Sequence, residues 1–121
     1  MQIDVQARNF SLTPAVRGYV IRRLYLTLST RADHVQRVVV GLSVANGPHG
    51  GEDKRCQIQV KLPHLPDVLI EDIDVDLYAA IDHATACAGR TVGRRLSRQR
   101  DTVRSSRQRG ITSSSALPET G

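Results

Sequence analysis

Arginines concentrate in one stretch of this chain, and their side chains have the chemistry to bind a polyanion. Residues 90–109 hold eight arginines and one aspartate, a net charge of +7. The whole chain carries +5, so the remaining residues together carry −2. A mildly acidic body with one strongly basic element indicates a protein that presents this element to nucleic acid, with phosphate contacts supplying affinity. The plainer alternative is a solvated helix face or a charged tail.

The spacing of these arginines fits a helix that binds phosphates on one side. Arg90, Arg94 and Arg98 recur every four residues, which places them on one face of a helix. Each guanidinium group can donate two parallel hydrogen bonds to phosphate oxygens. The apolar stripe of the same helix is offset from this face and includes Ala88, Val92 and Leu96. The helix can therefore pack on the protein while its arginines face RNA.

Two other groups of residues contain metal-ligand side chains, but their spacing predicts neither a metal site nor an enzyme. His83 and Cys87 stand four residues apart on the expected helix, but no third or fourth ligand follows at a recognisable spacing. Asp72, Asp74 and Asp76 lie on one face of an extended segment, as in some metal-dependent nucleases. Strand-end solvation and helix capping account for these carboxylates without a metal. We expect no catalytic residue, no cofactor and no small-molecule substrate.

Composition narrows the class of protein further. The 121 residues suffice for one domain, and 40% of them are apolar, so most of the chain should fold. Four aromatic residues are too few for a surface that stacks single-stranded bases. We expect a cytoplasmic protein without membrane contact, because no apolar stretch of signal or membrane length is present. The two cysteines should then be reduced thiols in or near the core.

Periodicity predicts six elements. Residues 2–7 alternate as a strand. Thr13 with Pro14 should start a helix whose apolar positions are 16, 20, 24 and 28 and whose other faces carry basic residues as far as Arg31. Residues 38–44 and 56–62 alternate as an antiparallel hairpin around the glycine-rich loop 46–53. Residues 68–74 predict a fourth strand, with Val68 and Ile70 facing inward although Leu69 and Ile73 compete. A long helix follows from the N-cap Asp76 to about residue 106.

These elements predict an α+β fold. The order strand, helix, three strands, helix favours a two-layer sandwich, with both helices on one face of a four-stranded sheet. Gly89 and Gly93 lie inside the second helix, so this helix either packs closely there or is irregular. We expect residues 108–121 to form a disordered, serine-rich tail. It ends in Leu-Pro-Glu-Thr-Gly, a sortase motif that we interpret as a cloning remnant.

The residues Asp76-Leu77-Tyr78-Ala79-Ala80-Ile81-Asp82 resemble a known family. The stretch is similar to the start of the second helix in ribosome hibernation promoting factors and ribosome-associated inhibitors, also called sigma-54 modulation proteins. The likeness covers residues 1–107 in the same element order. It implies a β-α-β-β-β-α fold, shared in outline with double-stranded-RNA-binding domains. It also implies a domain that binds the decoding region of the small ribosomal subunit and blocks messenger and transfer RNA sites.

The resemblance also implies which residues contact ribosomal RNA. By position, Arg90 and Arg94 match basic residues of the family's second helix most directly. The full set of expected RNA-binding residues is Arg90, Arg94, Arg95, Arg98 and Arg100, extended from the first helix by Arg22 and Arg23. Within the helix-start motif of Asp76, Tyr78, Ile81 and Asp82, we expect Tyr78 and Ile81 to pack or to position the helix rather than to bind RNA.

The chain departs from the family pattern in three ways. Its basic residues are nearly all arginine rather than lysine, its second helix contains two glycines, and it lacks the second domain of longer members. We therefore expect a monomer off the ribosome, and both a natural short form and a trimmed long form fit the sequence. Two other functions stay open: a general binder of structured or double-stranded RNA, and a regulator whose basic helix contacts an acidic protein.

Overall fold

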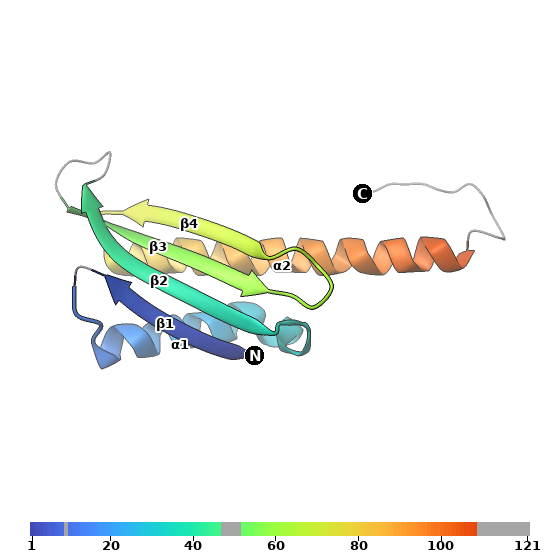
Figure 1. The fold of residues 1–121 in the computed structure, drawn as a ribbon, viewed down its shortest axis with the longest axis horizontal. Helices are drawn as coiled ribbons and strands as arrows, with labels where there is room; N and C mark the ends of the chain where they lie inside the picture. Colours follow the sequence, from blue (N-terminus) through green and yellow to red (C-terminus); the bar gives the residue numbers. More distant parts are fainter. Residues whose placement is uncertain (9, 47–51, 109–121) are drawn as a thin grey trace.

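The computed structural model describes residues 1–8, 10–46 and 52–108, and the backbone alone at residues 45, 46, 52 and 100–108. These residues form a four-stranded sheet with two long helices, arranged in two layers (Figure 1). The elements are β1 (Gln2–Arg8), α1 (Pro14–Leu28), the 3-10 helix η1 (Ser29–His34), β2 (Arg37–Asn46), β3 (Glu52–Lys61), β4 (Val68–Asp74) and α2 (Leu77–Gln108). The predicted element order and the α+β sandwich are confirmed.

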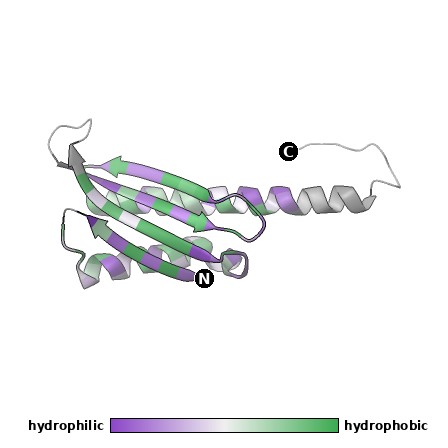
Figure 2. Ribbon diagram, in the orientation of Figure 1, coloured by the Kyte–Doolittle hydropathy of each residue, from purple (hydrophilic) through white to green (hydrophobic). Residues whose placement is uncertain are grey.

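The sheet has the order β1-β2-β3-β4, with β1 parallel to β2 and the other neighbours antiparallel. The predicted hairpin of the two middle strands is therefore confirmed. The register pairs Ile3 with Val38, Val40 with Ile58, and Ile58 with Ile70, which places the apolar positions of all four strands on one face. Hydropathy alternates along the strands accordingly (Figure 2). One sheet face is thus built for the core and the other for water.

Both helices cover the apolar face. The buried residues of α1 are those that the spacing predicts: Val16, Val20, Leu24 and Leu28. The buried positions of α2 are mostly small: Ala80, Ile81, Ala84, Thr85, Ala88 and Val92. Burying one large aliphatic side chain contributes about 1.5–3 kcal/mol, so the valines, leucines and isoleucines between the layers dominate stability. Beyond this stripe, α2 continues past the end of the sheet (Figure 1).

Both helices begin where capping chemistry predicts. The backbone N–H of Val16 donates to Oγ1 of Thr13 at 3.2 Å, and Pro14 occupies the first turn of α1. At α2, the N–H of Tyr78 donates to Oδ1 of Asp76 at 3.0 Å. These bonds satisfy N–H groups that have no partner inside the helix. The N-cap role expected for Asp76 is confirmed.

Two details differ from or refine the sequence interpretation. The first helix does not extend to Arg31: α1 ends at Leu28, and Arg31 lies on η1. In β4, Val68 is buried and Leu69 is 72% exposed, so the inward phase of Val68 and Ile70 is confirmed.

Both cysteines are free, and burial raises the pKa of the Cys56 thiol to about 12, which keeps it protonated.

The two interior glycines of α2 mark close packing. A Cβ on Gly89 would lie 3.0 Å from the carbonyl oxygen of Thr27 and 3.2 Å from its Cβ. A Cβ on Gly93 would lie 2.9–3.1 Å from the guanidinium group of Arg31. The helix is continuous through both positions. Of the two alternatives, close packing against α1 and η1 is therefore confirmed.

Some expectations concern residues outside the described part of the chain. The predicted tail lies there almost entirely, as do residues 47–51 of the predicted loop and the side chain at position 103. In the described part, neither helix has a stretch apolar enough to span a bilayer.

We expect opposite effects from side chains added at two helical glycines. Gly18 of α1 has nothing within 4 Å of a built Cβ, so Gly18→Ala should raise the free energy of unfolding by about 1 kcal/mol through helix propensity. Gly89→Val should lower it by about 1–3 kcal/mol, because the branched side chain forces the two helices apart. Urea unfolding followed by circular dichroism measures both. Equal stability of the two variants would contradict a tight contact at Gly89.

Candidate nucleic-acid interface

A basic groove lies between η1 and the outer half of α2. It has a volume of about 650 Å³ and is lined by Thr30, Arg31, His34, Arg90, Gly93, Arg94, Leu96, Ser97 and Gln99. Three of these residues are arginines, and no described residue in the lining is acidic. A concave surface with one sign of charge raises the local concentration of an oppositely charged ligand. The groove can therefore hold phosphate groups.

Gly93 lines the groove next to Arg31. The guanidinium group of Arg31 lies over this glycine, where any larger residue would meet it. Arg31 also donates a hydrogen bond to Oγ1 of Thr30 at 3.1 Å. A residue from η1 and two from α2 thus bring their positive charges to one place, although they are about sixty residues apart in the chain.

The three arginines spaced by four lie on the outer face of α2. Arg90, Arg94 and Arg98 are all exposed, whereas Val92 is buried and Leu96 is half-buried against the core. The apolar stripe and the basic face are therefore separate, as the spacing predicts. Nη2 of Arg94 lies 3.3 Å from Oγ1 of Thr91, so this guanidinium group follows the helix surface. Arg90 and Arg94 also line the groove.

Arg95 has a different environment from its neighbour Arg94. Its Nη1 donates to the carbonyl oxygens of Pro66 and Asp67, at 2.7 and 3.1 Å. These carbonyls belong to the β3–β4 turn, in which His64 has a φ of 65°. Arg95 therefore ties the turn to α2 by two bonds from one charged group. The side chain of Arg100, also expected to bind RNA, lies outside the described side chains.

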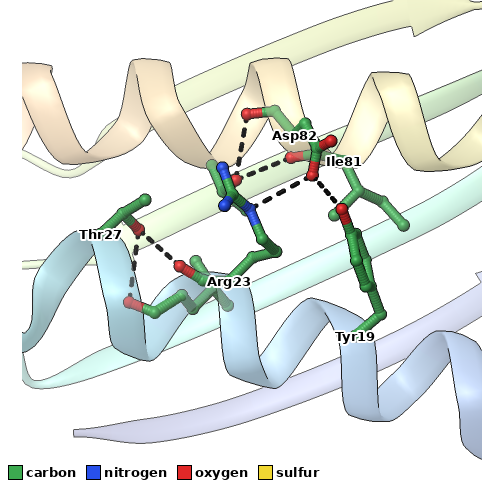
Figure 3. A network of polar contacts seen from close by, with 7 residues as sticks. Tyr19, Arg23, Thr27, Ile81 and Asp82 are labelled. Atoms are coloured by element: carbon green, nitrogen blue, oxygen red, sulfur yellow. Dashed lines mark hydrogen bonds and ion pairs between the residues drawn. The ribbon is translucent and has the colours of Figure 1, made fainter.

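The two expected arginines of α1 also differ from one another. Arg22 is exposed, whereas Nε of Arg23 lies 3.2 Å from Oδ1 of Asp82 on α2. The same carboxylate oxygen accepts a hydrogen bond from the hydroxyl of Tyr19 (Figure 3). The bond to Asp82 raises the pKa of Tyr19, so the phenol stays protonated as the donor. Arg23 thus joins the two helices.

The helix-start motif has a structural role throughout. Asp76 caps α2, Ile81 is fully buried, and Asp82 binds Tyr19 and Arg23. The ring of Tyr78 packs edge-on against that of Tyr19, with 4.8 Å between ring centroids. Ile81 thus lies in the core, whereas Tyr78 contacts α1 and stays 40% exposed, so the expectation that Tyr78 does not bind RNA stays a prediction. Tyr78 and Asp82 thereby hold the first turns of α2 against α1.

The fold and the motif agree with a known family. The pattern of the Sigma 54 modulation protein / S30EA ribosomal protein family matches residues 3–100, which is most of the chain. The chain belongs to this family. No curated protein matches the chain.

Two solved structures resemble this S30EA family member. The N-terminal domain of Protein Y from Thermus thermophilus is 35% identical, with a TM-score of 0.65 over 78% of this chain and 98% of that domain. A ribosomal subunit interface protein from Coxiella burnetii gives a TM-score of 0.69 over 80% of this chain and 99% of the other. Its identity is 15%, so this second likeness concerns the fold alone.

Two basic residues of the groove, Arg31 and His34, were not predicted from the sequence of this S30EA family member. Arg31 was interpreted as part of the first helix, and His34 was not considered. Both lie on η1, and helical periodicity gives no signal for a short 3-10 helix. The available signal was the basic pair at the end of that segment, followed by the strand that begins at Arg37.

We expect two neighbouring arginines of α2 to contribute differently to the free energy of unfolding. Arg95→Ala should lower the free energy of unfolding by about 1 kcal/mol, because two carbonyls of the β3–β4 turn lose a charged donor. Arg94→Ala should change it by less than about 0.5 kcal/mol. Both variants lose one positive charge, so each is the control for the other in thermal and urea unfolding. If Arg95→Ala is as stable as Arg94→Ala, the hydrogen bonds from Arg95 to the β3–β4 turn do not stabilise the protein.

Proposed function

We propose that this protein is a ribosome hibernation factor: it binds ribosomal RNA of the small subunit at the decoding region and inhibits translation by occupying the sites of messenger and transfer RNA. It acts by binding alone, without catalysis. The basic groove and the adjoining face of Arg98 form the contact, with phosphates of the RNA backbone as ligands. This is a cytoplasmic function, and it requires no cofactor.

The observation that carries the proposal is the clustering of arginines on a rigid support. Arg31, Arg90 and Arg94 line one groove without an acidic residue among its described lining. The helix that bears two of them is held by a buried stripe and by the polar contacts of Asp82. The fold therefore brings three guanidinium groups near one another before RNA binds, and each can donate paired hydrogen bonds to phosphate oxygens. Structured RNA supplies phosphates at fixed positions, so it is the matching polyanion.

Family membership supports the ribosome as the source of this RNA. The family whose pattern matches residues 3–100 carries the name of a ribosomal protein. The surface itself favours phosphate over base recognition, because Tyr25 and Tyr78 are the large aromatic side chains exposed among the described residues, and neither lines the groove. Shape and phosphate position would then decide which RNA is bound.

The first test is co-sedimentation of the protein with ribosomes, separated subunits and bare ribosomal RNA at several salt concentrations. We expect saturable binding of one copy to the small subunit. The triple substitution of Arg90, Arg94 and Arg98 to alanine should abolish most binding. It should also reduce the slope of log affinity against log salt by about 2–3, since each lost phosphate contact contributes about 0.7–0.9.

A triple substitution on the open sheet face is the matched control. Arg8, Arg37 and Lys61 occupy strand positions that face away from the helices, and their change to alanine removes the same net charge, together with the ion pair of Arg37 with Asp4. We expect this control to bind as the unchanged protein does. If both triple variants lose binding equally, net charge rather than the α2 surface is responsible. Equal binding to any structured RNA would support the general RNA-binding alternative, and binding only to an acidic protein would support a regulator of that protein.

The binding position needs its own measurement. Hydroxyl-radical footprinting of small-subunit RNA should show protection at the decoding region, and messenger RNA with initiator transfer RNA should compete with the protein. An Arg31→Ala variant should weaken the footprint, because this side chain lies in the groove beside Arg90 and Arg94. Protection elsewhere on the subunit would contradict the decoding-region proposal and would leave ribosome binding intact.

A further inference from the structure

At the end of β4, the structure brings together three side chains of types that bind metals. None of the three lines the basic groove. Asp72 and Asp74 are two residues apart on β4, so both point to the helix-covered face of the sheet. His83 reaches them from the second turn of α2. One donor atom from each residue lies within 4.8 Å of the other two. We propose that these three side chains bind a divalent transition-metal ion, with zinc as the reference ion.

The distances fit a site that needs little movement to close. Zinc donors lie about 2.1 Å from the ion, which places them about 3.4 Å apart in a tetrahedral arrangement. Oδ2 of Asp72 and Nδ1 of His83 are already 3.5 Å apart. The imidazole is 63% exposed, so a side-chain rotation can bring it and the carboxylates to one ion. Three protein ligands leave the remaining coordination position for water.

One oxygen of this cluster is shielded from solvent although the Asp72 side chain as a whole is 32% exposed. Oδ2 of Asp72 has almost no exposed surface, and it accepts no hydrogen bond. A shielded carboxylate oxygen without a hydrogen bond is costly, because it has lost its hydration without replacement. Nδ1 of His83 lies 3.5 Å from this oxygen but makes no hydrogen bond to it, and the two form an ion pair only when the imidazole is protonated. A metal ion between the two would supply the missing interaction to both.

The chemistry of the donors selects the class of ion. Two carboxylates and one imidazole suit zinc, manganese or nickel, whereas magnesium prefers oxygen ligands and retains most of its water. Lys54 of β3 is the register neighbour of Asp74 and brings one positive charge to this end of the sheet. Asp74 also accepts the backbone N–H of Asp76 at 3.0 Å, which orients its carboxylate. Of the two carboxylates, that of Asp74 is thus oriented by the backbone before an ion binds.

The site connects strand to helix at the start of α2. The pairing of Asp72 and Asp74 with His83 is one that sequence spacing does not show, because the strand and the helix are separated by a turn. Spacing instead suggests His83 with Cys87, one helical turn further on. A bound ion would hold the first turns of α2 against β4, at the end opposite to the Arg95 tie with the β3–β4 turn.

Isothermal titration of the whole chain, freed of metal by a chelator, tests the site with zinc chloride and with magnesium chloride. We expect one zinc per chain, no binding of magnesium, and a higher unfolding temperature in zinc. His83→Ala and Asp72→Asn should each weaken zinc binding by at least about tenfold, since even indirect partners of a metal contribute that much. Circular dichroism without metal shows whether each variant still folds.

Cys87→Ser and His34→Ala are the matched controls, and both should bind zinc as the unchanged chain does. Cobalt in place of zinc should give no thiolate charge-transfer band. Loss of binding in Cys87→Ser with retention in Asp72→Asn would overturn the proposal in favour of the cysteine pairing. Absence of one-to-one zinc binding would also overturn it. Since no ribosome takes part in these measurements, their outcome is independent of the proposed function.

Discussion

The position of α2 depends on the small size of the residues that it buries. Ala80, Ala84 and Ala88 let the helix lie close to the sheet, and Gly89 lets its backbone approach the carbonyl of Thr27 on α1. Side chains larger than these would lift the helix and separate it from η1. One turn further along α2, the guanidinium group of Arg31 lies over Gly93, and both residues line the basic groove. The basic groove therefore lies directly beside the closest packing of α2 on α1.

Most of the fold could be predicted from the sequence because its signals are local. Alternation identifies the strands, spacing of four identifies the buried face of α1, and Thr13 and Asp76 carry the capping chemistry of both helices. The phase of β4 was harder, since Leu69 is as apolar as its neighbours and only the register with β3 turns it outward. The role of the glycines was also open, because a helix interior penalises glycine whatever lies beside it. Only the packed structure shows what the missing side chain makes room for.

The candidate site was predictable only in part, because arginines with equal charge have different neighbours. The spacing of Arg90, Arg94 and Arg98 is visible in the sequence, and these three are exposed. Arg95 is one residue from Arg94, yet a rotation of about 100° turns it toward the carbonyls of the β3–β4 turn. Arg23 likewise differs from Arg22 by its contact with Asp82. Such partners lie about thirty to sixty residues away, so no local pattern can assign them.

Repulsion among the arginines of the groove affects both the stability of the protein and its attraction for phosphate. Arg90 and Arg94 are like charges at a spacing of four, which destabilises a helix by a few tenths of a kcal/mol per pair, and Arg31 adds a third charge across the groove. No acidic side chain in the described lining of the groove offsets this repulsion, whereas acids elsewhere do pair with arginines, as Asp82 does with Arg23. The core must hold these charges together, and a polyanion in the groove would convert their repulsion into attraction. Like charges that repel one another in the free protein and attract phosphate are what the proposed RNA binding requires.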